Sequence, residues 1–133
     1  MNNIEKEFVP YAEALALKEL GFDEPCLGFY VKTQPKLNIG FIKNDRIYNE
    51  NSNGNSLVGY GKSLIYASTF SQAFRWFREK HGIHSLIDGA HPWFRYAINS
   101  RDNEWEGFKE LDFEKCQLAC IRKQIEIVKE NKR

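Results

Sequence analysis

The sequence predicts an α+β fold, with one domain over residues 1–133 and an antiparallel sheet packed against helices. Three segments repeat apolar residues with helical spacing and carry helix start or stop signals. Short aromatic and β-branched segments stand between them, bounded by Gly, Pro or Asn. Hydrophobic residues make up 42% of the chain and aromatic residues 14%, which is enough to fill a core. The expected element order is α-β-β-(β)-α-β-β-α.

The first helix is expected over residues 9–20. The segment PYAEALALKELG is rich in helix formers, Pro10 suits the first turn and Gly21 suits a left-handed C-cap. Its apolar residues fall on more than one side, so this helix is expected to be well buried. Residues 26–31 (CLGFYV) and 37–42 (LNIGFI) have strand composition and are expected to pair as a hairpin.

The segment at about 44–56 is expected to be a long Asn-rich loop, because five Asn and one Gly favour turns over a ladder. Strand character returns at residues 63–68. A helix is expected over residues 70–81, ending at Gly82. Its apolar residues recur at helical spacing and predict a core stripe. The stripe consists of Phe70, Ala73, Phe74 and Phe77.

A second hairpin is expected from residues 83–88 and 93–100, on either side of a Gly- and Pro-containing turn at 89–92. The last helix is expected over residues 113–129. It contains no Gly or Pro, and Asp112 before it is a good N-cap.

Charge and cysteine usage narrow the function classes. The net charge is +1, with 7 basic against 8 acidic residues up to Tyr66 and 12 against 10 after it. Nucleic-acid binding is not excluded, but it would need a local basic patch. The absence of a long apolar run argues against a membrane protein. An odd number of cysteines (Cys26, Cys116 and Cys120) fits reduced thiols and a cytoplasmic location.

The best candidate for a binding surface lies in the second hairpin. Strand alternation puts Trp93 and Arg95 on one face and Phe94, Tyr96 and Ile98 on the other. If the second set faces the core, Trp93 and Arg95 remain outside.

The helix at 70–81 carries a second candidate surface, formed by Arg75, Trp76 and Arg78 beside the core stripe. Such a patch is suited to stack on bases or to anchor a protein partner. The alternative is that Trp76 covers the edge of the core while the arginines pair with acidic neighbours.

The terminal helix has an apolar arc wider than one sheet contact needs. Either several elements cover it, or it meets a second chain and forms a homodimer. The residues of the dimer-interface candidate are Leu118, Ile121, Ile125 and Val128.

Three weak motifs assign no chemistry. The segment SLVGYGKS (56–63) ends like a phosphate-binding loop, but it lacks the first Gly and the strand-to-helix context. The three His residues with Cys116 and Cys120 lack zinc-ligand spacing, and nothing marks either thiol as a nucleophile. No catalytic residue, metal or cofactor is therefore assigned, and an enzyme is the less expected class.

Three blocks of sequence resemble a family of small uncharacterised proteins encoded by gut anaerobic bacteria and their phages or mobile elements. The blocks are EALALKELGFDEPC (13–26), FRWFREKHG (74–82) and LACIRKQIEIVK (118–129). The resemblance implies a phage or mobile-element accessory protein in the bacterial cytoplasm, and it brings no catalytic residues.

Together these observations predict a non-catalytic binding protein that acts on a host or phage protein. Three alternatives are a nucleic-acid-binding protein, a small-molecule-binding or small-molecule-modifying protein, and a purely structural oligomer.

Overall fold

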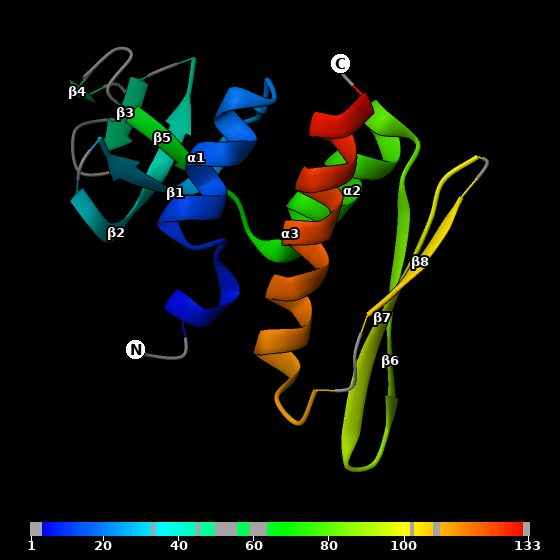
Figure 1. Cartoon of the computed structure of the whole chain (residues 1–133). Helices are drawn as coiled ribbons and strands as arrows, with labels where there is room; N and C mark the ends of the chain where they lie inside the picture. Colours follow the sequence, from blue (N-terminus) through cyan, green and yellow to red (C-terminus); the bar gives the residue numbers. More distant parts are fainter. Residues whose placement is uncertain are drawn as a thin grey trace. The chain divides into compact units, whose positions relative to one another are not determined.

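The computed structural model describes residues 4–32, 34–44, 46–49, 56–58, 64–101, 103–107 and 110–131. The chain divides into two compact units, Met1–Thr69 and Phe70–Arg133 (Figure 1). Both units combine helix with antiparallel sheet, which confirms the predicted α+β class. The expected single-domain organisation stays a prediction.

In its described part, the first unit forms a five-stranded sheet in the order β4-β3-β2-β1-β5, with a helix packed on β5. Its elements are η1 (Glu5–Glu7), α1 (Tyr11–Glu19), β1 (Cys26–Val31), β2 (Gln34–Lys43), β3 (Arg46–Asn49), β4 (Ser56–Val58) and β5 (Leu64–Ala67). All neighbouring strands in this sheet are antiparallel.

The core of the first unit lies between α1 and the strands β1 and β5. All four residues of β5 are buried, and Leu17 of α1 is also buried. The Tyr30 hydroxyl donates a hydrogen bond to the Val9 carbonyl at 2.9 Å, which ties β1 to the segment before α1. Lys18 Nζ donates to the Leu64 carbonyl at 2.8 Å, so α1 is also held to β5.

The second unit is a helix pair on a three-stranded sheet of order β6-β7-β8. Its elements are α2 (Phe70–His81), β6 (His84–Ala90), β7 (Trp93–Asn99), β8 (Glu104–Glu106) and α3 (Phe113–Asn131). Figure 1 shows α2 and α3 on the same side of this sheet, and α3 packs against β6, β7 and α2. Phe77, Ile83, Ile98 and Ile121 are fully or almost fully buried, so the core lies between the helix pair and the inner sheet face.

The predicted helices are confirmed to within two residues at each end. Gly21 (φ 101°) and Gly82 (φ 63°) adopt the left-handed conformation expected after α1 and α2. Asp112 caps α3, because its carboxylate accepts hydrogen bonds from the amides of Glu114 at 2.9 Å and Lys115 at 3.4 Å. A hydrogen bond with the Glu114 side chain, together with these two amide hydrogen bonds, lowers the pKa of Asp112.

Both predicted hairpins are confirmed as β1–β2 and β6–β7. The loop prediction for 44–56 is wrong in part, because β3 and the start of β4 lie in it and residues 50–55 fall outside the described ranges. β3 forms because its backbone pairs with β2 in register, with Ile47 opposite Ile42 and Arg46 opposite Lys43, and this pairing outweighs the turn-favouring composition. Strand β8 was not predicted either.

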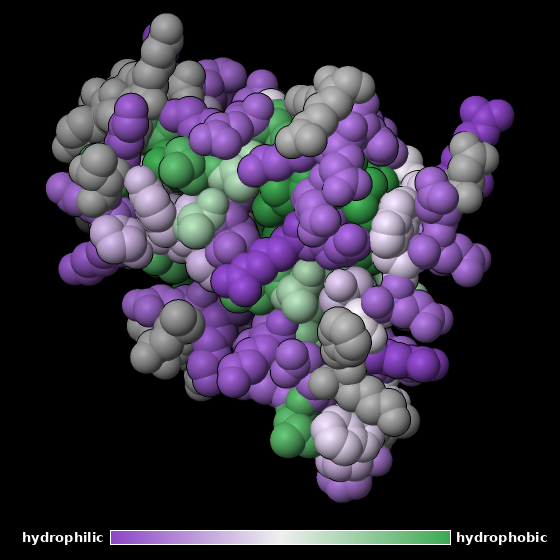
Figure 2. Space-filling view, viewed as in Figure 1, coloured by the Kyte–Doolittle hydropathy of each residue, from purple (hydrophilic) through white to green (hydrophobic). Residues whose placement is uncertain are grey.

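Polar residues dominate the surface on the face seen in Figure 2. No helix in the described ranges is both long and apolar enough to cross a membrane.

Candidate functional site

Trp93 and Arg95 lie on the outer face of the β6–β7–β8 sheet, as the alternation of side chains in β7 predicts. Trp93 is 41% exposed and Arg95 is exposed, whereas Phe94 and Tyr96 are half-buried and Ile98 is buried. Phe94, Tyr96 and Ile98 lie on the side of the sheet that faces α3. There the Phe94 ring packs edge-on against the Phe113 ring, with 5.5 Å between the ring centroids. The predicted split of β7 into a core face and an outer face is therefore confirmed.

Strand pairing defines the neighbours of Trp93 and Arg95 on this outer face. Asp88 stands opposite Arg95, and the two form an ion pair at 3.6 Å. Leu86, which is 64% exposed, stands opposite Ala97 on one side, and Glu106 stands opposite Ala97 on the other. We define the outer face by these cross-strand neighbours: His84, Leu86, Asp88, Trp93, Arg95, Ala97, Asn99, Glu104 and Glu106.

The outer face combines exposed apolar side chains with a net negative charge. Its described residues include three carboxylates, of Asp88, Glu104 and Glu106, against the single guanidinium of Arg95. The ion pair is more than half exposed on both sides, so it contributes little to stability. Such a face is suited to protein contact, because aromatic and Arg side chains dominate binding energy at protein interfaces.

The structure shows that Trp76 is not part of an exposed surface with Arg75 and Arg78 on α2. Trp76 is 3% exposed and packs edge-on against the rings of Phe77 at 5.2 Å and His81 at 4.8 Å, so it belongs to the core. Phe74, predicted as part of the core stripe, is only half-buried. The buried face of α2 is therefore turned toward Trp76 and away from Phe74.

The two arginines of α2 have different surroundings. Arg75 pairs with Glu79 one turn along the helix at 4.0 Å, and both side chains are more than half exposed. Arg78 forms no ion pair with any residue in the described part of the chain, and it lines a cleft of about 360 Å³.

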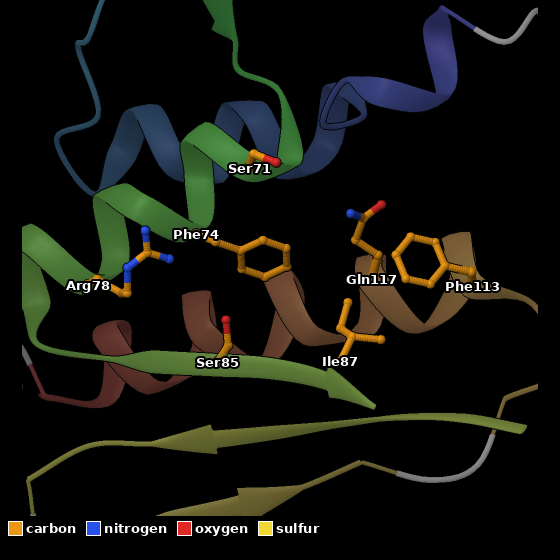
Figure 3. Close-up of a pocket in the computed structure, with 7 residues that line it drawn as sticks. All are labelled: Ser71, Phe74, Arg78, Ser85, Ile87, Phe113 and Gln117. Carbon is orange, nitrogen blue, oxygen red and sulfur yellow. The ribbon is translucent and has the colours of Figure 1, made fainter. Parts of the chain in front are cut away.

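The cleft lies between α2, α3 and β6 (Figure 3). Figure 3 shows the Phe74 ring extending from α2 and the Phe113 ring from α3, with Gln117 between them in this view and the Ile87 side chain rising from β6. Its lining residues are Ser71, Phe74 and Arg78 of α2, Ser85 and Ile87 of β6, and Phe113 and Gln117 of α3. Sequence reasoning missed this cleft, because its residues come from three elements and form no motif.

The four dimer-interface candidates are mostly buried within the single chain. Ile121, Ile125 and Val128 are 0%, 6% and 2% exposed, and Leu118 is half-buried. The wide apolar arc of α3 is covered by several elements of the same chain, because α3 packs against α2, β6 and β7. Homodimerisation through these residues stays a prediction.

The three cysteines are buried, and none of them forms a disulfide. Burial raises the pKa of Cys120 to about 12, although a hydrogen bond with the Ser85 hydroxyl acts in the opposite direction. Burial also raises the pKa of Cys116. Both thiols are therefore poor nucleophiles at neutral pH. Within the described ranges, no three His, Cys, Asp or Glu side chains gather where they could hold a metal ion.

One face of the β2–β3 hairpin carries a local positive charge, although the net charge of the whole chain is only +1. Lys43 stands opposite Arg46, and Phe41 lies two residues before Lys43 on the same face. All three side chains are exposed. The sequence signal for this positively charged face is the composition of residues 26–49, which include four basic residues and one acidic residue.

Comparison with family models, curated proteins and solved structures finds no match to this chain. The function is therefore inferred from the residues and their geometry.

Proposed function

We propose that this protein is a non-catalytic binding protein, and that it docks another protein on the outer face of the β6–β7–β8 sheet. The observation that carries the proposal is the exposure of Leu86 and Trp93 on a face that no described element of the second unit covers. Removing such side chains from water on docking is favourable, by about 25 cal/mol per Å² of apolar surface. A Trp beside an Arg is also the typical composition of an interface hot spot.

The net negative charge of the outer face favours a partner protein with basic side chains. Glu104 and Glu106 flank the apolar residues on the β8 side, and Arg95 is already paired with Asp88. A complementary partner places Lys or Arg side chains over β8 and an apolar side chain over Leu86 or Trp93. Nucleic acid does not suit this face, because its phosphates would meet an excess of carboxylates.

The family resemblance supports a host or phage protein as the partner, and a role as a phage or mobile-element accessory protein in the bacterial cytoplasm. A second copy of the chain is the other protein that the experiment must distinguish.

The test compares partner capture by three forms of the immobilised protein in nuclease-treated bacterial lysate: wild type, Trp93→Ala and Leu111→Ser. Leu111 is the matched control, because it is 65% exposed but lies just before α3 and not on the sheet. A protein captured equally by wild type and Leu111→Ser, but at least about tenfold less by Trp93→Ala, supports the proposal.

Two further measurements complete the test. Glu106→Lys should also weaken capture, because it removes charge complementarity, and native mass spectrometry identifies a second copy as the partner. Equal capture by Trp93→Ala and wild type would refute docking on this face, as would an equal loss with Leu111→Ser.

Nucleic-acid binding is a second candidate function, and the β2–β3 hairpin face favours it. Lys43 and Arg46 can neutralise phosphates, while Phe41 beside them offers a ring on which a base can stack. Fluorescence anisotropy with a labelled single-stranded oligonucleotide tests this candidate. We expect salt-dependent binding that Lys43→Glu and Phe41→Ala each weaken. Binding that survives both substitutions would rule out this face.

A further inference from the structure

We propose that the cleft between α2, α3 and β6 binds a small aromatic molecule that carries one anionic group. This is a binding site separate from the docking face. Alternation in β6 places Ser85 and Ile87 on the helix side of the sheet, and Leu86 and Asp88 on the outer face. The proposal therefore does not depend on the proposed function.

The size of the cleft favours a small ligand. Its volume is about 360 Å³. Small-molecule sites span about 300 to 1,000 Å³, so this cleft lies near the lower limit. One ring with a short side chain is the size of ligand that it suits.

The apolar part of the lining favours a ring. Phe74 and Phe113 approach the cleft from two different helices, and Ile87 comes from the sheet (Figure 3). Phe113 is held in place by its edge-on contact with Phe94 of β7. An aromatic ligand packs against such rings in edge-to-face or offset geometry and gains more than its buried area alone supplies.

The charge of the lining favours an anion. Arg78 is the one charged residue among the seven that line the cleft, and no carboxylate lines it. The neighbouring cation on α2, Arg75, is paired with Glu79 and does not line the cleft. A carboxylate or a phosphate matches the planar fork of the Arg78 guanidinium.

Polar groups among the lining residues complete the site. Ser71 and Gln117 supply hydroxyl and amide groups able to donate to an anion or to a ring substituent. Ser85 of β6 supplies a further hydroxyl group to the lining. The site thus combines apolar walls with a few convergent polar groups, as ligand sites do.

The experiment titrates the ¹⁵N-labelled full chain with four probes and follows amide chemical shifts by NMR. Phenylacetate and phenyl phosphate carry both the ring and the anion, 2-phenylethanol carries the ring alone, and acetate carries the anion alone. We expect millimolar binding of at least one aromatic anion, with shifts at Ser71, Ser85 and Gln117. The tighter of the two reveals whether the site prefers a carboxylate or a phosphate. We expect 2-phenylethanol and acetate to bind about tenfold more weakly.

Two matched variants test the role of Arg78. Arg78→Gln removes the cation from the cleft and should weaken the aromatic anion about tenfold. Arg75→Gln removes a cation from the same exposed helix surface without touching the cleft, and should leave affinity unchanged. Both residues are exposed, so both variants are expected to fold.

Several results would overturn the proposal. The first is absence of binding by both aromatic anions up to their solubility limits. The others are equal binding of 2-phenylethanol, equal binding of acetate, or an equal loss of affinity in the two Arg variants. The probe series on the wild-type chain decides the question even if a variant fails to fold.

Discussion

Gln124 of α3 offers the sharpest test of the energetics of this fold. The side chain is fully buried, and neither its amide nitrogen nor its amide oxygen has a hydrogen-bond partner in the described part of the chain. A buried polar group left unsatisfied costs about 1–3 kcal/mol. Gln124 therefore lowers the free energy of unfolding, and its replacement by an apolar side chain of similar shape should raise it.

Gln124→Met keeps the length of the side chain and removes both unsatisfied groups. Two such groups at the lower limit cost about 2 kcal/mol, and a volume-conserving core substitution costs less than about 1.5 kcal/mol. We therefore expect the free energy of unfolding to rise by at least about 0.5 kcal/mol, and by about 2 kcal/mol if packing is fully retained.

Urea unfolding followed by tryptophan fluorescence is the appropriate assay. All three tryptophans, Trp76, Trp93 and Trp105, lie in the second unit, so the signal reports the unit that contains Gln124. The urea midpoint should rise without a change in the slope of the transition. Gln117→Met is the matched control, because Gln117 lies two turns earlier on α3 and is only half-buried. A loss of stability of more than about 1 kcal/mol in Gln124→Met would refute the reasoning, because it would show that the amide is hydrogen-bonded in the folded protein.

Three further predictions concern the core, the buried acidic groups and the docking face. Ile125→Glu should unfold the second unit, because a carboxylate would enter a site that is 6% exposed; a folded, soluble monomer recovered from a wild-type dimer would instead identify a dimer interface. Burial raises the pKa of Cys120 from 9.0 and of Tyr30 from 10.0, both to about 12, so both groups are neutral in the folded chain and ionise more readily when it unfolds. The stability that they contribute is complete below pH 9 and should fall between about pH 9 and 12; urea midpoints measured against pH by circular dichroism, which reports both units, check this. Cys120→Ala should make the fall above pH 9 shallower without removing it, because burial also raises the pKa of Cys116 and Tyr30 is unchanged. Trp93→Ala should change the free energy of unfolding by less than about 1 kcal/mol, and a larger loss in the same fluorescence assay would place the indole in the core.

Local signals account for the parts of the fold that the sequence predicts well. The helix at Phe70–His81 was predicted with its observed bounds, because apolar periodicity and Gly82 both act within a few residues. Alternation in β7 likewise predicts the exposure of Trp93 and Arg95, since successive side chains of a strand point to opposite faces.

The short length of two strands explains why the sequence does not predict them. Strands β3 and β8 contain only four and three residues, too few to show strand periodicity, and each is stabilised by pairing with the strand before it across a short turn. The cleft was missed for a different reason, because its residues are separated in sequence by up to 46 positions, from Ser71 to Gln117.

By itself, the sequence determined the α+β class, the three helices and the outward face of β7, because these depend on spacing along one element. Only the tertiary structure decided that Trp76 is buried and Phe74 lines a cleft, since periodicity puts both at opposite margins of one apolar arc of α2. The same holds for α3. Its apolar arc is wide enough to contact a partner chain, but in the structure α2, β6 and β7 bury most of this arc within the single chain. The physical reason is that a helix pattern determines which side chains are apolar, whereas the neighbours that cover them determine which are removed from water.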